Sequence, residues 1–425
     1  MKKTNDSKQT RSVKTKRILS AIAACLTAAM CMPLTSCVTS ISATEVSAGY
    51  RRQTDESGRE SDALWAAMSD LSFKLLGNAF GEDAGNIMIS PYSIAMCLGM
   101  LTEGADGETR AQLEGLFGMD GDTLSRALYA LTERLCADDD ATVSVADSIW
   151  IRNGSNVKSD FLQRNADWYS AEVYQAAFDA TTVKDINKWC SDNTDGMIDK
   201  VIDSISADAV MYLINAVCFE AEWQKEYKRS DISDWVFHNL DGSDANVKML
   251  CSSDEKYIEG CDLYGFARNY EGGKFSFVGL LPTDENADIF DVARGLDGSA
   301  WLEMWRSASG RANVYIPEFK LEYKTELNDV LCALGVRDVF DPAVADLGGI
   351  SDNDDIFCSK IEHKTYFELD RQGTRAAAVT YGELNATSCI VTNNKIVNLD
   401  RPFIAMIVDN ESGMPVFCGV VTSIK

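Results

Sequence analysis

The chain contains 425 residues, with 40 Lys and Arg, 65 Asp and Glu, and only two His. Its hydrophobic content of 46% predicts a globular protein with a sizeable core and excludes a largely disordered chain. The net charge of −25 argues against binding to nucleic acid and against adsorption to anionic lipid. Because His238 and His363 are the only histidines, there is little room for His-rich metal sites or several general bases, and we expect neither metal nor cofactor.

The first 36 residues have the pattern of an export signal. Residues 1–17 contain seven Lys and Arg against a single Asp, and an apolar run follows over residues 18–34. A basic segment before an apolar segment is typical of a signal peptide, which is removed from the mature protein. Because Pro33 interrupts the run and polar residues follow it, a membrane-spanning helix is the weaker interpretation.

Residues 34–37, with the sequence LTSC, resemble a bacterial lipobox. The resemblance implies that Cys37 is lipidated and becomes the mature N-terminus; the alternative is cleavage elsewhere, with Cys37 an ordinary leader residue. Loss of residues 1–36 would bring the net charge to −31, so membrane attachment would depend on the lipid anchor alone. Residues 37–60, rich in Ser, Thr and Arg, are predicted to be a flexible tether. We therefore expect an exported protein, either a cell-surface lipoprotein or extracellular.

Residues 61–425 are predicted to form one large domain, since they contain no repeat and no proline-rich linker. The spacing of apolar residues predicts helices over residues 63–80, 91–101, 109–117, 123–135 and 181–203. Apolar and alternating runs predict strands over residues 142–151, 209–219, 275–281, 312–319, 356–369, 402–409 and 415–423. Helices come first and strands dominate later, with long gaps between pairing partners. This order indicates an α+β fold with large mixed sheets.

A series of motifs in this domain resembles the serpin family of serine protease inhibitors. The motifs occur in the family's order: residues 86–94, 186–189 with 194–198, 211–219 with Trp223, 334–336 with Phe340 and 345–350, 363–365 with Glu368, 373–374 with 376–378, and 401–403. The resemblance covers residues 61–425. It implies three β-sheets, eight or nine helices, an exposed reactive-centre loop, a monomer, and an inhibitor in place of an enzyme.

Residues 370–400 form an unusually long segment with no strong core signal between two predicted strands. As a strand, this segment would place small or apolar side chains on one face and more polar ones on the other. The first face carries Thr374, Ala376, Ala378, Thr380, Gly382 and Leu384, and the second carries Arg375, Ala377, Val379, Tyr381, Glu383 and Asn385. An exposed loop does not need such alternation, whereas a loop that later becomes a central strand does.

The resemblance implies a suicide-substrate mechanism. A serine protease cleaves the loop and forms an acyl-enzyme, and the loop then inserts into the central sheet before water completes hydrolysis. Counting from Gly373 as in the family places the scissile bond at Thr387-Ser388, with Ala386, Ser388 or Cys389 possible if the register shifts. A small uncharged residue suits the shallow primary pocket of elastase-like enzymes and does not suit trypsin-like ones. Cysteine proteases are an alternative target.

The hinge implied by the resemblance consists of Gly373, Thr374, Arg375, Ala376, Ala377 and Ala378. Arg375 stands where inhibitory members usually have glutamate, which favours the alternative of a non-inhibitory serpin that acts as a binding protein. Arg371 likewise replaces a glutamate, and Glu318 replaces the lysine with which that glutamate pairs. Because both signs are reversed together, we predict an Arg371–Glu318 ion pair at the top of the sheet, near Trp223. Two independent surface charges are the alternative.

Ser90, Ser93, Asn215 and His363 match the polar cluster that lies beneath the sheet opening in the family. Their predicted role is a buried hydrogen-bond network that must separate when the loop inserts. In a second interpretation, Ser90 or Ser93 is a nucleophile and His363 its base. No Gly-x-Ser-x-Gly motif accompanies either serine, so the structural role is preferred.

Overall fold

The computed structural model describes residues 40–54, 58–80, 85–137, 140–352, 356–374 and 394–425. The chain divides into two units, Met1–Ser40 and Ile41–Lys425, and the second contains the folded domain. The predicted lipidation site Cys37, the hinge residues 375–378 and the predicted scissile bond Thr387-Ser388 lie outside the described residues. Within the described part, no helix is both long enough and apolar enough to cross a bilayer.

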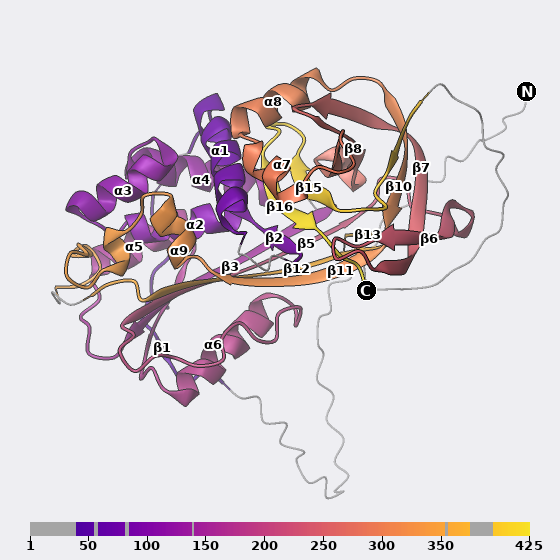
Figure 1. Cartoon of the computed structure of the whole chain (residues 1–425). Coiled ribbons are helices and arrows are strands. Elements are labelled where there is room, and N and C mark those ends of the chain that lie inside the picture. Colours follow the sequence, from indigo (N-terminus) through magenta and orange to yellow (C-terminus); the bar gives the residue numbers. More distant parts are fainter. Residues whose placement is uncertain (1–39, 55–57, 81–84, 138–139, 353–355, 375–393) are drawn as a thin grey trace, which may run out of the picture. The chain divides into compact units, whose positions relative to one another are not determined.

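The described residues form nine α-helices and sixteen strands in an α+β arrangement, as predicted (Figure 1). The helices are α1 (Asp62–Asn78), α2 (Pro91–Thr102), α3 (Gly107–Phe117), α4 (Gly121–Cys136), α5 (Ser159–Trp168), α6 (Ala180–Asn193), α7 (Ile289–Gly295), α8 (Gly298–Ser307) and α9 (Asn328–Ala333). Helix α2 begins as its sequence predicts: Ser90 caps the first turn, its hydroxyl accepting from the Ser93 amide at 3.3 Å, and Pro91 occupies the first helical position. Every residue of α2 is buried, so this helix lies inside the core.

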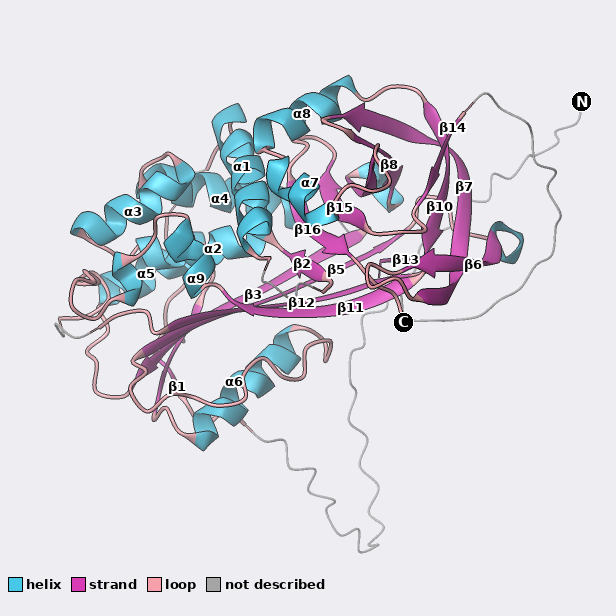
Figure 2. Ribbon diagram, viewed as in Figure 1, coloured by secondary structure: helices cyan, strands magenta, loops and turns pink. Residues whose placement is uncertain are grey.

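Two sheets organise the domain (Figure 2). The seven-stranded sheet has the order β1 (Thr44–Glu45), β4 (Glu172–Ala176), β3 (Ala141–Arg152), β5 (Met211–Glu222), β13 (Gly373–Thr374), β12 (Lys360–Leu369) and β11 (Phe319–Glu326). The nine-stranded sheet has the order β14 (Lys395–Asn398), β10 (Arg311–Pro317), β7 (Asp244–Gly260), β8 (Leu263–Asn269), β9 (Phe275–Pro282), β15 (Phe403–Asp409), β16 (Pro415–Val421) and β2 (Ile87–Ile89), with β6 (Ile232–His238) also paired to β7. The resemblance implies three sheets. Here the 17-residue strand β7 pairs with both β10 and β8 and so joins strands of two of them into the single nine-stranded sheet.

Strand β5 is buried on both faces, which explains its continuous apolar sequence. Leu213 and Val217 point into the main core beside α2, whereas Ile214 and Ala216 point into a second core formed with α6. In Figure 1, α6 covers the face of the seven-stranded sheet opposite to α2. Over residues 211–219 the central strand therefore has no polar face, and the one polar side chain there, Asn215, lies deep in the protein.

Two predicted boundaries differ from the structure. The helix predicted over residues 181–203 ends at Asn193, because Asp195 and Gly196 adopt positive φ angles of 46° and 74° that a helix cannot continue. Part of the predicted tether, residues 37–60, is ordered against the domain: β1 pairs with β4, and Ser42 donates to Asp185 of α6 at 2.6 Å. Main-chain pairing holds this segment, so it needs no apolar period.

An ion-pair cluster ties α4 and the start of α1 to β15. Arg134 of α4 binds both oxygens of Asp409 at 2.8 and 2.9 Å and both oxygens of Glu60 at 2.6 and 2.8 Å. The Asp409 side chain is fully buried. The geometry is bidentate on both sides, and the hydrogen bonds to Glu60 and Asp409 raise the pKa of Arg134 against the opposing effect of burial.

We predict that Arg134→Met lowers the free energy of unfolding by about 3 kcal/mol or more, because it leaves the buried Asp409 carboxylate without its counter-charge. The matched control is Arg294→Met, which removes an exposed pair with Asp291 and should cost less than about 1 kcal/mol. Urea unfolding followed by circular dichroism measures both values. Equal losses in the two variants would contradict the prediction.

Candidate functional site

The two central strands of the seven-stranded sheet, β5 and β12, are paired at one end and separated at the other. Strands β5 and β12 pair directly and in parallel where Tyr212–Val217 lie beside Lys360–Thr365. At the other end β13 lies between them, with Thr374 opposite Ala221 of β5 and Leu369 of β12. The first two hinge residues therefore already occupy the gap between the central strands.

Gly373 is required by this close approach. A Cβ atom at position 373 would lie 1.9 Å from the carbonyl oxygen of Ala221, which no side chain can tolerate without movement of the backbone. The turn before it is held by Asp370, whose side chain accepts from the amides of Gln372 and Gly373 at 2.7 and 3.2 Å. The predicted start of the hinge is thus a tight turn fixed by local hydrogen bonds.

Aromatic side chains hold this turn against β5. Trp223 donates from its indole nitrogen to the carbonyl of Asp370 at 2.9 Å and stacks on Tyr270 with 4.6 Å between ring centroids. The Tyr270 hydroxyl contacts the hydroxyl of the buried Thr374. The Arg268 guanidinium lies 5.1 Å from the centroid of Trp223. Trp223 and Thr374, predicted from separate motifs, therefore belong to one site.

The predicted Arg371–Glu318 contact takes a different form. The main-chain amide of Arg371 donates to the Glu318 carboxylate at 3.3 Å. Among the described residues, no ion pair within 4.0 Å joins the Arg371 guanidinium to Glu318; the two residues meet through the main chain, and the ion pair stays a prediction. Burial raises the pKa of Glu318, and the Arg371 amide opposes this shift. The hydrogen bond comes from the amide, and the Arg371 charge also acts to lower the pKa of Glu318.

Below this turn, polar side chains form a row across three strands. Asp147 of β3 lies opposite Asn215 of β5, and Asn215 lies opposite His363 of β12. The Asn215 amide donates to the carbonyl of Ser93 at 2.9 Å and to Asp147 at 2.5 Å, and it also contacts the Ser93 hydroxyl. The Asn215 oxygen contacts Nδ1 of His363. The four residues predicted to form the network, Ser90, Ser93, Asn215 and His363, are brought together.

The hydrogen bonds fix the state of His363. Its Nε2 accepts from the main-chain amide of Ser90 at 3.2 Å, so Nδ1 carries the proton and donates to Asn215. Burial lowers the pKa of His363 to about 3, which keeps the ring neutral. The Ser90 hydroxyl donates to the carbonyl of Val416 at 2.9 Å. Because Nε2 faces the Ser90 amide and not a hydroxyl, the geometry does not support a serine nucleophile with His363 as its base.

Comparison with known proteins identifies the family. The family model described as "Serpin (serine protease inhibitor)" matches residues 66–424. The chain belongs to the serpin family. Neuroserpin of Homo sapiens is 29% identical over 376 residues, which cover 84% of this chain and 90% of neuroserpin. Leukocyte elastase inhibitor A of Rattus norvegicus is 32% identical over 362 residues, which cover 80% and 93% of the two chains.

A solved structure confirms the predicted serpin fold. The thermophilic serpin tengpin in its native state matches with a TM-score of 0.85 and 34% sequence identity, over 90% of this chain and all of that chain. The family is described as one of serine protease inhibitors.

Asp147 is the member of this serpin's polar row that the sequence analysis missed. Burial raises the pKa of Asp147 to about 7, although the hydrogen bond from Asn215 opposes the shift. The signal was present in β3: Val143, Val145, Ile149 and Ile151 alternate toward the main core, and Asp147 occupies an inward position of the same series. An acidic residue at a predicted inward position marks a site worth testing.

We predict that Asp147→Asn reduces the pH dependence of stability. The folded-state pKa of about 7 lies above the ordinary value of 3.8, so the folded state binds the proton more tightly than the unfolded chain. The contribution of Asp147 to stability should therefore be lost as pH rises from about 4 through 7. The lowered pKa of His363 acts with the opposite sign but is common to both proteins.

The measurement is the midpoint of thermal unfolding at pH 6 and pH 8 for the wild-type protein and Asp147→Asn. The drop between the two pH values should be smaller in the variant. Asp208→Asn, at an exposed position, controls for the loss of one carboxylate and should keep the wild-type drop. An unchanged drop in Asp147→Asn would show that Asp147 does not titrate in this range.

Proposed function

We propose that this serpin is a suicide-substrate inhibitor of elastase-like serine endopeptidases and that its cleaved loop inserts between β5 and β12. The observation that carries the proposal is the position of Gly373 and Thr374, which already lie between these strands. The similarity to leukocyte elastase inhibitors and to neuroserpin supports protease inhibition. The inhibitor itself would supply no nucleophile, since the protease carries out the chemistry.

The register of β13 predicts how the inserted strand would lie. Thr374 is opposite both Ala221 and Leu369, so continuing the antiparallel pairing by six residues brings Thr380 opposite Asn215 and His363. Thr380 belongs to the inward face of the alternation, as Thr374 does. Its hydroxyl would then replace the contact between Asn215 and His363, so the buried polar groups would not lose their partners on insertion.

Insertion would release substantial free energy. The fourteen residues from Thr374 to Thr387 would span about 45 Å at about 3.3 Å per residue. A dozen new ladder bonds at about 1 kcal/mol each, with burial of the inward face, would supply on the order of 10 kcal/mol. This value is comparable with the stability of a whole domain, and it would be enough to distort a trapped protease.

The preference for elastase-like enzymes rests on the small uncharged residue at Thr387 in the proposed scissile bond. We further propose that the protein is exported, that Cys37 carries a lipid anchor, and that the inhibitor acts as a monomer.

Arg375 in the hinge favours the second candidate function, a non-inhibitory serpin that acts as a binding protein.

A panel of proteases tests this function directly. Incubation with elastase, trypsin and a papain-like cysteine protease should give a complex stable in SDS with elastase, and mass spectrometry of the released fragment should place the cut within residues 384–390. Cleavage without a complex, followed by no rise in the thermal unfolding midpoint, would favour the binding protein. A complex with trypsin alone would contradict the elastase preference.

A matched pair of hinge variants tests insertion. Ala378→Arg would bury a guanidinium without a partner in the inserted strand, at a cost of several kcal/mol. It should turn the inhibitor into a substrate and raise the stoichiometry of inhibition at least about ten-fold. Ala378→Ser keeps a small neutral side chain at the same inward position and should keep inhibition. Equal behaviour of the two variants would contradict insertion in the predicted register.

A further inference from the structure

We propose that a cavity beside the free edge of β3 binds a small organic amine, with Asp147 as the counter-ion of its ammonium group. The cavity has a volume of about 400 Å³ and lies between α4, β3 and α6. This volume is within the range of small-molecule sites. The inference goes beyond protease inhibition, and its test does not depend on a protease.

The edge of β3 is open at this point. Strand β4 pairs only with Ser148–Arg152 of β3 among the described residues, so residues 143–147 have no partner strand on that side and line the cavity. Main-chain carbonyl groups on an unpaired edge can accept hydrogen bonds. One of them, that of Val143, is 3.7 Å from the Cys136 thiol. An ammonium group has three donors and no acceptor, which suits an edge rich in acceptors.

The charged side chains that line the cavity are all acidic. Its lining includes the carboxylates of Glu133, Asp147 and Glu172, and no lysine or arginine is among its described lining residues. Glu172 is already occupied, because the Tyr174 hydroxyl at 2.6 Å and the Trp189 indole donate to it. Asp147 has a neutral partner, the Asn215 amide, and burial disfavours its charged form. A cationic ligand would supply the charge that this site lacks.

The aromatic side chains of the lining already contact a cation at the edge of the cavity. The guanidinium carbon of Arg52 lies 3.7 Å from the ring centroid of Tyr129 and 5.1 Å from that of Trp168. Both rings belong to the cavity lining. Attraction between cations and aromatic rings is strongest where water is partly excluded. Aromatic rings and a carboxylate together select an ammonium group with an apolar body.

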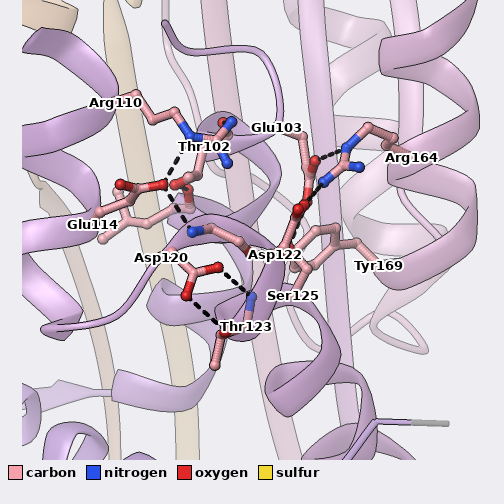
Figure 3. Close-up of polar contacts among 12 residues, drawn as sticks. Thr102, Glu103, Arg110, Glu114, Asp120, Asp122, Thr123, Ser125, Arg164 and Tyr169 are labelled. Atoms are coloured by element: carbon pink, nitrogen blue, oxygen red, sulfur yellow. Dashed lines mark hydrogen bonds and ion pairs between the residues drawn. The ribbon is translucent and has the colours of Figure 1, made fainter. Parts of the chain in front are cut away.

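A rigid wall makes the cavity largely preformed. Tyr169, another lining residue, donates to Ser125 at 2.8 Å, and Ser125 contacts Glu103, which pairs with Arg164 (Figure 3). Glu103 is almost fully buried. This network fixes the Tyr169 ring, so binding would need little reorganisation of the wall.

Binding of an amine in the cavity would also affect the sheet opening, a consequence that rests on the proposed function. Asp147 accepts from Asn215, and Asn215 contacts His363 across the strands that separate on insertion. An ammonium group beside Asp147 would favour the ionised carboxylate, which is the stronger acceptor for Asn215. Ligand binding should therefore stabilise the closed arrangement and slow insertion.

Isothermal titration calorimetry of the full chain with benzylamine tests the site, with benzyl alcohol as the uncharged analogue. Benzylamine should bind about ten-fold more tightly than benzyl alcohol, and Asp147→Asn should remove most of that difference. Asp208→Asn should bind as the wild type does. Equal affinity for the two compounds, or full retention of benzylamine binding in Asp147→Asn, would overturn the proposal.

A second variant keeps the test decisive if circular dichroism shows that Asp147→Asn does not fold. Glu133→Gln changes an exposed carboxylate at the cavity, and it should weaken benzylamine binding about two-fold. Glu303→Gln, on the exposed face of α8, should leave binding unchanged. Unchanged affinity in Glu133→Gln would count against the site. Failure of protease inhibition with intact benzylamine binding would refute only the proposed function.

Discussion

The structure depends on a central sheet that must hold together and yet remain able to open. Strands β5 and β12 pair over six residues each and diverge where β13 lies between them. The contact between Asn215 and His363 joins the two strands just below the point of divergence. It is a hydrogen bond between neutral groups, which can exchange one partner for another at little cost. An apolar contact here would hold the strands without offering a replacement partner to an incoming strand.

The buried charges of the domain show the opposite design. Arg134 with Asp409 and Arg164 with Glu103 are paired in close geometry, and each pair joins elements that must not separate. Leaving either carboxylate unpaired would cost several kcal/mol of folding free energy, so these ion pairs hold their elements together throughout. The partly buried Asp147 differs from these carboxylates, since its hydrogen-bond partner is the Asn215 amide.

Much of this arrangement could be predicted from the sequence. The order of motifs gave the family, and the polar network and the position of Gly373 followed from it. The main-chain contact between Arg371 and Glu318 could not be predicted, because a sequence does not show whether the amide or the guanidinium lies nearer to the carboxylate. Strand β1 was missed because it is only two residues long and is held by main-chain pairing and by polar contacts such as that of Ser42 with Asp185, which give no apolar alternation. Strand β7 has mixed burial, so its alternation is too irregular to detect.

The order in which strands pair has a consequence for how the chain folds. Asn215 and His363 are 148 residues apart, and β2, near the start of the domain, pairs with β16, near its end. Neither sheet can be completed until the last strands have been made. Contacts between residues so far apart in the sequence form slowly, because the chain loses the entropy of a long loop before strand pairing offsets that loss. Synthesis from the N-terminus therefore leaves β5 exposed on one edge for more than a hundred residues, during which its apolar faces are the chain's main risk of aggregation.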